Sequence, residues 1–460
     1  MSAPGVADPD RVPVADHARV PGAGREPNDV TSAVEVPGES GPEAPAQVAR
    51  RGIGTFRALS RRNFRLYFIG QIISNSGTWM QTVAQSWLVL ELTKSGLALG
   101  LVSAAQFLPI LLLSPLAGVY VDRTDKRRLL VFTQSAFALI ALGLGVLVLA
   151  KLVALWMVFA LAALMGIVNA IDTPARQSFV IEMVGKEDLA NAVSLNAVLM
   201  NSARVIGPAI AGAVIYRFGV GPNFIVNAIS YVAVIASLLM LRSSELMPSP
   251  PLQARKGQLR EGLRYVARTP RLAIPLLIML VVGTLAYEFQ VSLPLLTTLT
   301  FHLGAGAYAA ITAALGVGAV IGGLVAATYA KPSMRRLAGA ALIFGSLMVV
   351  AALMPTFYTS LGAVALAGLV SIIFLSTANT LLQITAKPDM RGRVMALYTV
   401  AFLGTTPIGA PLVGYIAQHF GGRAGILVGG VATVAAGALG ALAMQLARKR
   451  RIEALERSVA

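Results

Sequence analysis

The sequence predicts an all-α membrane protein in which twelve transmembrane helices form two six-helix repeats. Long runs without an ionised residue, such as residues 95–121 and 337–386, are the first observation behind this prediction. A helix needs about 20 apolar residues to cross about 30 Å of hydrocarbon, a length that a buried helix of a soluble protein does not need. The second observation is composition, because 56% of the residues are hydrophobic and only 13% are charged. Soluble domains carry about 25% charged residues.

An internal repeat is the third observation. Gly207, Pro208 and Gly212 in the fifth span match Gly409, Pro411 and Gly414 in the eleventh, and the matching glycines are 202 residues apart. Duplication explains both the spacing and the rank of the helices, and chance agreement between Gly-rich helices is the alternative. Small residues here are expected to let helices pack closely. Two such repeats are typical of transporters that bind their substrate between the repeats.

The segments before, between and after the bundles divide the chain into five parts. Residues 1–50 are rich in Pro, Gly, Ala, Asp and Glu, which predicts a disordered tail and not a signal peptide. Residues 51–241 and 272–447 are expected to form the N-terminal and C-terminal six-helix bundles. Residues 242–271 link the bundles, and residues 448–460 are expected to form a basic cytoplasmic tail.

The predicted spans follow in order from the uncharged runs. The two longest runs need internal breaks, which we expect at His302–Gly306 and at Pro355. The expected spans are residues 66–91, 95–121, 129–150, 152–171, 189–216, 218–241, 272–299, 305–330, 337–354, 357–386, 394–418 and 422–447.

Lys and Arg predict how the spans are oriented. One set of loops and both chain ends carry most of these residues, and the other set carries only Lys94, Lys151, Arg217 and Arg423. Cytoplasmic loops of membrane proteins are enriched in Lys and Arg. We therefore expect both termini in the cytoplasm and a location in the plasma membrane, the bacterial inner membrane.

The linker contains a predicted amphipathic helix. Leu259, Leu263, Val266 and Ala267 lie along one side, and Arg260, Arg264, Arg268 and Arg271 lie along another. Such a helix is expected to lie along the inner leaflet. A solvated linker helix is the alternative, and the pattern does not separate the two.

Several classes of function are excluded by what the sequence lacks. The net charge of +17 belongs to loops that flank the membrane, so nucleic acid is not an expected partner. The chain has no cysteine and its three histidines lie far apart, so no metal site is expected. No phosphate-binding loop occurs, because Gly185-Lys186 continues into Glu187. We expect no cofactor, no ATP-binding domain and, without clustered acids or histidines in adjacent spans, no enzymatic activity.

A charged motif follows the second predicted span. Its residues are Gly118, Asp122, Arg123, Arg127 and Arg128. The pattern resembles the Gly-x-x-x-Asp-Arg-x-Gly-Arg-Arg signature of the major facilitator superfamily, with Asp125 where that family usually has glycine. The resemblance implies that Asp122 holds the inner gate shut in the outward-facing state. Anchoring by positive charge is the alternative, and it explains the arginines but not Asp122.

Further segments resemble particular branches of this superfamily. Residues 204–212 resemble its antiporter motif, which occurs in exporters more than in importers. Residues 70–95, 172–177 and 391–395 are similar to the family of the bacterial enterobactin exporter and other secretion-type facilitators. The resemblance extends over about residues 55–445. It implies the major facilitator fold and the export of small molecules.

Polar side chains recur every three or four residues along the first span. They are Gln71, Ser74, Asn75, Thr78, Gln81 and Gln85. In lipid such groups would lack hydrogen bonds, so we expect this stripe to face a central cavity, and hydrogen bonding between helices is the alternative. Other cavity candidates are Gln106, Asn196, Arg204, Tyr287, Asn379 and Gln383, with Trp79, Met80 and Phe289 as apolar surface. Arg204 is notable because a cation within a span is costly and usually faces a cavity or a partner.

Two acids are candidates for proton coupling. Glu288 is the only acid well inside a predicted span, where a carboxyl group can bind and release a proton. Asp172 is the second candidate, because it lies near the inner end of the fourth span and can pair with Arg176.

Together these features predict a secondary active transporter that exports amphipathic small molecules by alternating access and proton-coupled antiport. The expected cargo is drug-like compounds or secreted metabolites such as siderophores. The expected partners are the small-molecule substrate, protons and the lipid bilayer. An importer or uniporter of the same fold is one alternative, and a lysophospholipid or lipid flippase of the same fold is another.

Overall fold

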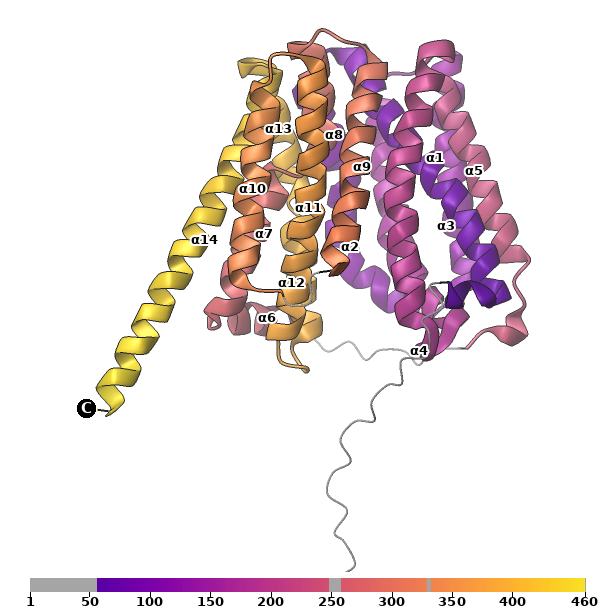
Figure 1. Cartoon of the computed structure of the whole chain (residues 1–460). Coiled ribbons are helices and arrows are strands. Elements are labelled where there is room, and N and C mark those ends of the chain that lie inside the picture. The colour runs from indigo at the N-terminus through magenta and orange to yellow at the C-terminus, as the bar shows by residue number, and fades with distance from the viewer. Residues whose placement is uncertain (1–55, 248–257, 329–331, 460) are drawn as a thin grey trace, which may run out of the picture. The chain divides into compact units, whose positions relative to one another are not determined.

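The computed structural model describes residues 56–247, 258–328 and 332–459, which form helices joined by short turns (Figure 1). The predicted disordered tail and the Pro-rich start of the linker lie outside the described residues. The described part is all-α, so the predicted fold class is confirmed.

The described part of the first bundle is built from five long helices. They are α1 (Arg62–Thr93), α2 (Gly96–Asp122), α3 (Lys126–Leu149), α4 (Leu155–Phe218) and α5 (Gly221–Leu239), with the 3-10 turns η1 (Arg57–Ser60) and η2 (Ser243–Glu245) beside them. α4 consists of two spans that meet at Gly185, whose φ of 72° interrupts the helix. Asp172 and Arg176, one turn apart, form an ion pair of 3.0 Å. Because their charges compensate each other, the helix continues past residue 171, where we expected a loop.

The second bundle has more breaks. The linker helix α6 (Gln258–Ala267) leads into α7 (Pro270–Leu285), α8 (Phe289–Leu295), the π-turn η3 (Leu296–Thr300), α9 (Ala305–Thr328), α10 (Met334–Leu353), α11 (Phe357–Thr385), α12 (Arg391–Phe402), α13 (Thr406–Phe420) and α14 (Gly422–Val459). α14 continues to Val459, past residue 447, where the last span was expected to end. α7 and α8 follow one another as one broken span, and so do α12 and α13.

Twelve spans are predicted, and the described helices that meet the length and hydropathy expected of a span are fewer. Ten helical segments of the described ranges are long and apolar enough to cross a membrane. α1 is not among them because its polar stripe lowers its hydropathy, although it is 32 residues long and packs against α4 and α5. With α1 and the broken span α7–α8, the arrangement is consistent with twelve crossings.

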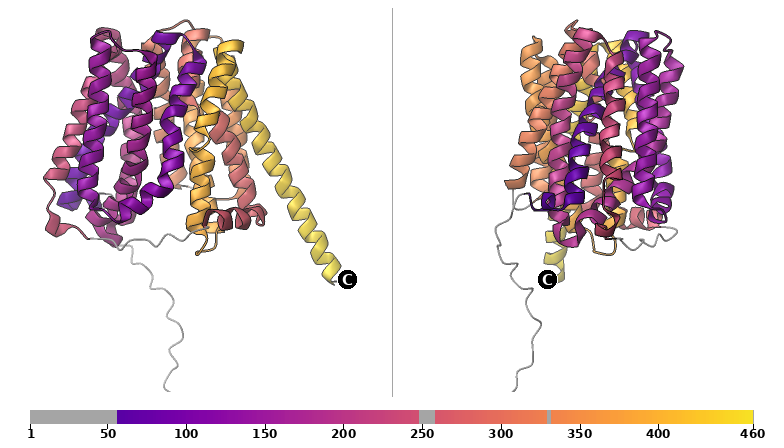
Figure 2. Two further views of the ribbon diagram at one scale, coloured as in Figure 1. Left: turned by 180° about the vertical axis from the view of Figure 1, so that it is seen from behind. Right: turned by 90° about the vertical axis from the view of Figure 1, so that its right-hand side faces the viewer.

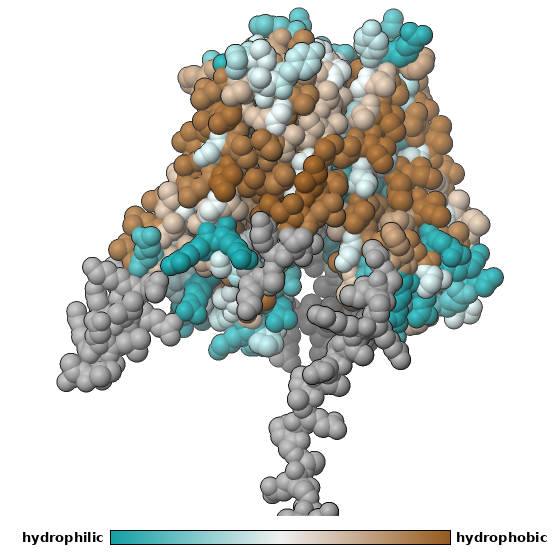
Figure 3. Space-filling model, viewed as in Figure 1, coloured by the Kyte–Doolittle hydropathy of each residue, from teal (hydrophilic) through white to brown (hydrophobic). Residues whose placement is uncertain are grey.

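On the face drawn in Figure 3, an apolar belt lies between two more polar ends. Side chains such as Leu116, Phe132 and Ile408 are about two-thirds exposed, at 70%, 67% and 67%. Large exposed apolar surfaces on this scale are the surfaces that lipid covers. One end carries Lys126–Arg128, α6 and Arg391–Arg393, and we call it the basic end.

Two helix pairs join the bundles. α2 of the first bundle packs against α13 of the second, and α4 packs against α9. Figure 2 shows the ribbons of the two bundles converging toward the end opposite the basic end. The core runs across the junction, since the largest hydrophobic cluster contains buried residues of both bundles, including Met80 and Met279.

The linker helix α6 lies across the end of the second bundle. The chain bends by 109° between α6 and α7. Glu261 forms an ion pair of 2.8 Å with Arg393 of α12, and Val266 is buried against α12. Arg264 is exposed, and Leu263 is 52% exposed. This geometry favours a helix that lies along the inner leaflet, which stays a prediction.

Candidate functional site

A cavity of about 270 Å³ lies between the bundles. The first bundle contributes Trp79, Thr82, Val83, Ser103, Phe107, Asn201 and Arg204, and the second contributes Tyr287, Glu288, Phe289, Gln290, Tyr308, Thr312, Leu315, Ala319, Ser371, Ile372, Leu375, Phe402, Leu403 and Thr406. Most of this lining is apolar or aromatic, and it contains one cation and one acid. A concave, mainly apolar site with a few polar groups is typical of small-molecule binding.

Glu288 reaches this cavity because the helical backbone is interrupted between α7, which ends at Leu285, and α8, which begins at Phe289. It is the residue that precedes α8, with φ −81° and ψ 42°. The side chain is 4% exposed, and its Oε1 is buried without a hydrogen-bond partner. Gly409 of α13 lies directly behind the carboxyl group, where an added Cβ would be 3.0 Å from Oε1.

Arg204 enters the cavity from α4. Its Cζ lies 4.8 Å from the centre of the Trp79 ring, a cation–π contact. Its Nε is buried without a hydrogen-bond partner. Within the described ranges no ion pair within 4.0 Å joins Arg204 to Glu288, although both line the cavity.

An aromatic wall faces these charged groups. The rings of Tyr287 and Phe402 are 4.9 Å apart at their centres, and those of Tyr287 and Phe289 are 5.6 Å apart. The Tyr287 hydroxyl donates a hydrogen bond of 2.9 Å to the Ser371 carbonyl oxygen. This bond satisfies the tyrosine donor, so the wall presents mainly ring surface to the cavity.

Part of the α1 stripe lines a small polar pocket beside the cavity. Thr78, Gln81 and Gln85 lie there together with Gln106 of α2, and Ser103 borders both spaces. Gln81 accepts a hydrogen bond of 2.6 Å from Asn227 of α5. These predicted residues therefore line the small pocket and not the larger cavity, and Gln81 also bonds between helices.

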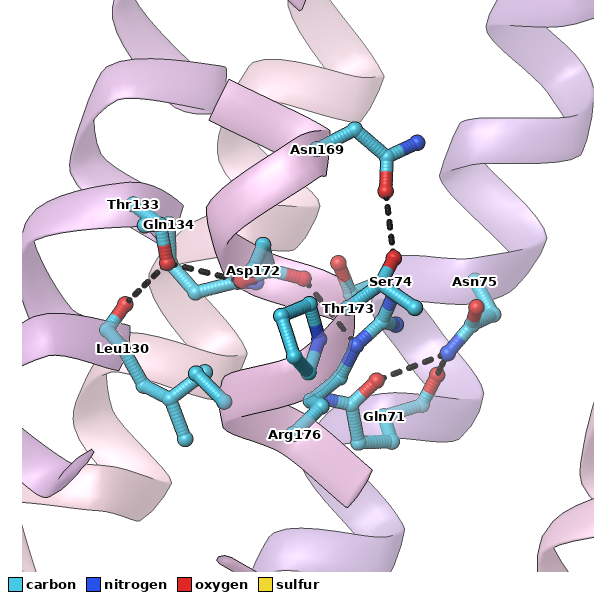
Figure 4. A network of polar contacts seen from close by, with 12 residues as sticks. Gln71, Ser74, Asn75, Leu130, Thr133, Gln134, Asn169, Asp172, Thr173 and Arg176 are labelled. Carbon is cyan, nitrogen blue, oxygen red and sulfur yellow. Dashed lines mark hydrogen bonds and ion pairs between the residues drawn. The ribbon is translucent and has the colours of Figure 1, made fainter. Parts of the chain in front are cut away.

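The other end of the stripe lies away from the cavity, in a buried polar network of the first bundle (Figure 4). Asn75 donates a hydrogen bond of 2.8 Å to Gln71 Oε1, and both side chains are buried. Neither residue is part of the cavity lining. This hydrogen bond lies within α1, so these two residues show neither exposure to the cavity nor the expected bond between helices.

Asp172 is the centre of a second set of contacts in Figure 4. Its Oδ1 accepts hydrogen bonds of 2.7 Å from Thr133 and 2.9 Å from Gln134, and its Oδ2 pairs with Arg176 at 3.0 Å. Asp172 is 0% exposed. All of these partners belong to α3 and α4, so Asp172 lies outside the central cavity and is held by structural contacts.

Three further predicted cavity residues, Asn196, Asn379 and Gln383, line neither the cavity nor the small pocket. Asn196 is exposed on α4. Gln383 donates a hydrogen bond of 2.6 Å to Asn379, one turn earlier in α11, and its backbone carbonyl oxygen accepts one from Arg391. Arg391 begins α12, so this pair lies toward the basic end of the bundle and not beside Glu288.

The charged motif after α2 joins elements within the first bundle. Arg127 donates hydrogen bonds of 2.7 and 2.9 Å to the carbonyl oxygens of Leu238 and Leu239, at the end of α5. Asp125, the departure from the usual glycine, accepts from the Arg128 N–H and caps α3. A helix N-cap is a position that Asp favours.

Asp122 has a different environment from its neighbours. It is partly exposed, and among the described residues it forms no ion pair within 4.0 Å. Gly118 has open space where a side chain would start, and Arg123 and Arg128 are exposed. The motif is therefore not engaged with the second bundle in this structure.

The repeated glycines make equivalent contacts in the two bundles. Gly207 packs against Trp79 of α1, and Gly409 packs against Thr284 of α7. Gly212 contacts Ala309 of α9, and Gly414 contacts the backbone of Gly96 in α2. In each repeat the first glycine contacts the first span of its own bundle, and the second glycine contacts the other bundle. Pro208 and Pro411 lie inside α4 and α13.

The bundles are in close contact at the end opposite the basic end. Gln418 Oε1 accepts hydrogen bonds of 2.9 Å from Ser95 Oγ and 3.1 Å from the Leu97 N–H. Gly96 and Gly100 of α2 lie against the backbone of α13 just below. The cavity is therefore covered at this end by packed backbone.

Several lining residues were not predicted. Asn201, Gln290, Thr312 and Thr406 are single polar residues in apolar helices and follow no spacing that would mark them. Asn201 lies one turn before Arg204 in α4, which is the one signal that could have identified it.

A family model described as transmembrane secretion effector matches residues 53–458. The staphyloferrin A transporter of Staphylococcus aureus (strain NCTC 8325 / PS 47) is 25% identical, over 80% of this chain and 93% of that protein. The multidrug efflux pump Tap of Mycolicibacterium fortuitum is 27% identical over 84% and 96%, respectively. The enterobactin exporter EntS of Citrobacter koseri is 26% identical over 82% and 90%.

Solved structures share the fold. A bacterial homolog of the human lysosomal transporter Spinster, inward-facing and unoccupied, has a TM-score of 0.66 at 15% identity and matches 84% of this chain and 96% of that one. A bacterial homologue of the iron transporter ferroportin, also inward-facing, has a TM-score of 0.63 at 16% identity, over 83% and 98%.

Proposed function

Because this chain belongs to the transmembrane secretion effector family of the major facilitator superfamily, we propose that it exports amphipathic small molecules in exchange for protons. It is a multi-pass membrane transporter, and the similar proteins include exporters of siderophores and drugs. The observation that carries the proposal is the cavity between the bundles, with aromatic walls and a buried carboxyl group.

The direction of opening follows from the ends of the molecule. The basic end is the cytoplasmic end if Lys and Arg mark the inner side. The hydrogen bonds from Ser95 and Leu97 to Gln418 then close the outer side. We therefore assign the structure to a state in which the cavity is reached from the cytoplasm, the state in which an exporter takes up its substrate.

The charged motif after α2 is proposed as the inner gate. In the state described here Asp122 has no ion-pair partner among the described residues, as expected while the gate is open. When the bundles rock and the basic ends meet, a carboxylate at this position can contact the N-terminus of a helix of the second bundle. Such a contact exists in one state only, so it stabilises that state.

Glu288 is proposed as the residue that carries the proton. It lies in the substrate cavity itself, at a helix break where it can face either side as the bundles move. Proton and substrate would then compete for one carboxyl group, which is a simple basis for exchange. Asp172 is the weaker candidate because Thr133, Gln134 and Arg176 already occupy its oxygens.

Transport in proteoliposomes tests this proposal. The protein is reconstituted, and an outwardly or inwardly directed proton gradient is imposed across vesicles supplied with tetracycline, a macrolide or a catecholate siderophore. We expect at least one compound to move against its concentration gradient in the direction opposite to proton flow. Movement in the same direction as protons would indicate an importer, and movement of labelled lysophospholipid alone would indicate the flippase. No movement of any compound with either gradient would contradict proton exchange.

A further inference from the structure

The two charged side chains of the cavity come from different bundles and have no counter-ion. Arg204 belongs to α4 and Glu288 precedes α8, and within the described ranges neither forms an ion pair within 4.0 Å. Arg204 Nε and Glu288 Oε1 are both buried without a hydrogen-bond partner, and the polar neighbour of the Glu288 carboxyl group is the uncharged Thr406 hydroxyl. The ion pairs that the structure does contain, such as those of Asp172 and Asp188, lie outside this cavity.

Unpaired ionisable groups at this depth point to a ligand. A charge inside a membrane protein is costly unless a partner compensates it, and buried polar atoms normally have hydrogen bonds. The Trp79 ring face, 4.8 Å from the Arg204 Cζ, stabilises the positive charge. The ring accepts no hydrogen bond in the plane of the guanidinium, whose N–H donors form a fork suited to an oxyanion.

The surface between the two groups is apolar. Phe107, Tyr287, Phe289 and Phe402 supply rings there, and the Tyr287 hydroxyl is already bonded to Ser371. A ligand that fills about 270 Å³ would therefore place an aromatic or aliphatic body among these rings. Its polar groups would have to lie at the two charged positions.

We propose that the substrate is a small amphipathic zwitterion, with an oxyanion such as a carboxylate on Arg204 and a protonated amine on Glu288. The assignment rests on the proposed proton exchange, in which the amine and the proton compete for the Glu288 carboxylate. A purely anionic substrate would not compete with that proton, and a purely cationic substrate would be repelled by Arg204. A zwitterion compensates both groups and connects the two bundles.

Binding to a variant with one tryptophan tests this charge requirement. The chain has three tryptophans, so Trp87→Phe with Trp156→Phe leaves Trp79, in the cavity, as the only fluorescent reporter. The probes are four forms of the dipeptide Phe-Phe. The free dipeptide carries both charges, its C-terminal amide only the positive charge and its N-acetyl form only the negative charge. The doubly capped form carries neither. We expect Phe-Phe to change Trp79 fluorescence with an affinity at least about tenfold higher than each capped form, because each cap leaves one charged group unpaired.

Two substitutions assign the charges to their partners. Arg204→Gln should remove the preference for Phe-Phe over the amide while the preference over the N-acetyl form remains. Glu288→Gln should do the reverse. This crossed pattern separates binding roles from a general loss of structure, which would weaken all four probes together. The matched controls are Arg217→Gln and Glu187→Gln, which are exposed on the same helix α4 and should leave the order of affinities unchanged.

Three outcomes would overturn the zwitterion assignment. They are equal affinity for all four probes, tightest binding of a singly charged or neutral form, and no response of Trp79 to any probe. Proton exchange is judged separately by the vesicle experiment with its own compounds. The crossed pattern without proton-driven transport would leave the substrate class standing and would reject the exchange mechanism.

Discussion

Glu288 lies where helical structure stops, between α7 and α8, and this position brings its carboxyl group into the cavity. Gly409 is part of the reason, because a larger residue there would occupy the space behind Oε1. The break and the glycine together allow one acid to be buried in the site without a cation beside it. The chemistry proposed for this transporter depends on that single side chain.

We predict that Glu288→Gln abolishes proton-driven transport while substrate binding stays measurable, about tenfold weaker than in the wild type because the ion pair with the amine is lost. Glutamine keeps the shape and hydrogen-bonding capacity of the side chain but cannot exchange a proton at neutral pH. The measurements are gradient-driven uptake in proteoliposomes and equilibrium binding to the same preparation. Full concentrative transport by this variant would remove Glu288 from the coupling mechanism.

Asp172→Asn should act on stability and not on coupling. The change leaves the partly buried Arg176 without its counter-ion, which costs about 1.5 to 3 kcal/mol. We expect a clearly lower thermal unfolding midpoint for the purified protein. Glu187→Gln is the control, because that side chain is 82% exposed and its contact with Arg57 is worth little. Unchanged stability combined with lost proton-driven transport would instead make Asp172 a coupling residue.

At this scale the sequence could identify the charged residues but not their neighbours. Glu288 and Arg204 were found because ions are rare in membrane spans and need a reason to be there. The α1 stripe was read correctly as one face, yet Gln81 lies beside the cavity while Gln71 and Asn75 lie in the buried polar network. Periodicity gives the face of a helix but does not say which helix packs against each turn of it.

Among the elements, α4 and α13 each use two glycines to contact one helix of their own bundle and one of the other. These contacts place the backbone of α13 against that of α2 at the closed end. Close backbone packing of this kind depends on the absence of a side chain. The same surfaces must separate when the closed end opens. Glycines have no side chains that could interlock with the facing helix, so the two backbones can move apart.

We predict that Gly414→Leu abolishes transport while the protein still folds into the membrane. A leucine at 414 would overlap the Gly96 backbone, so the end opposite the basic end could not close. Gly143→Leu in α3 is the control, because nothing lies within 4 Å of the added Cβ there. The measurements are proteoliposome transport and size-exclusion elution. Wild-type transport by Gly414→Leu would show that this contact is not needed.

The sequence predicted most helices but missed the breaks inside two spans and the helical segment that contains the Asp172–Arg176 ion pair. The break at Gly404, between α12 and α13, was missed because the expected span 394–418 runs through it, although Gly404 and Pro407 are ordinary break signals. The break before Glu288 has neither residue at residues 286–288 and was not foreseen. The segment through Asp172 was expected to be a loop because the fourth span was ended at its first charged residue, whereas the helix continues through the Asp172–Arg176 pair.

The whole molecule is two bundles joined by two helix pairs, α2 with α13 and α4 with α9. The cavity lies between the bundles, and both carry a charged group into it. A rocking motion about these pairs would exchange the closed end for the open one without changing either bundle internally. The repeat in the sequence predicted this division, since equivalent glycines make equivalent contacts.

The most direct test of alternating access is a pair of distances measured by electron–electron double resonance on spin-labelled protein in lipid nanodiscs. The chain has no cysteine, so labels can be placed only where intended. One doubly labelled variant carries Ser194→Cys and Gln383→Cys toward the basic end, and a second carries Lys94→Cys and His419→Cys, two exposed positions at the opposite end. On changing pH from alkaline to acidic, we predict that the first distance shortens while the second lengthens. Two distances that stay fixed, or that lengthen together, would contradict the account.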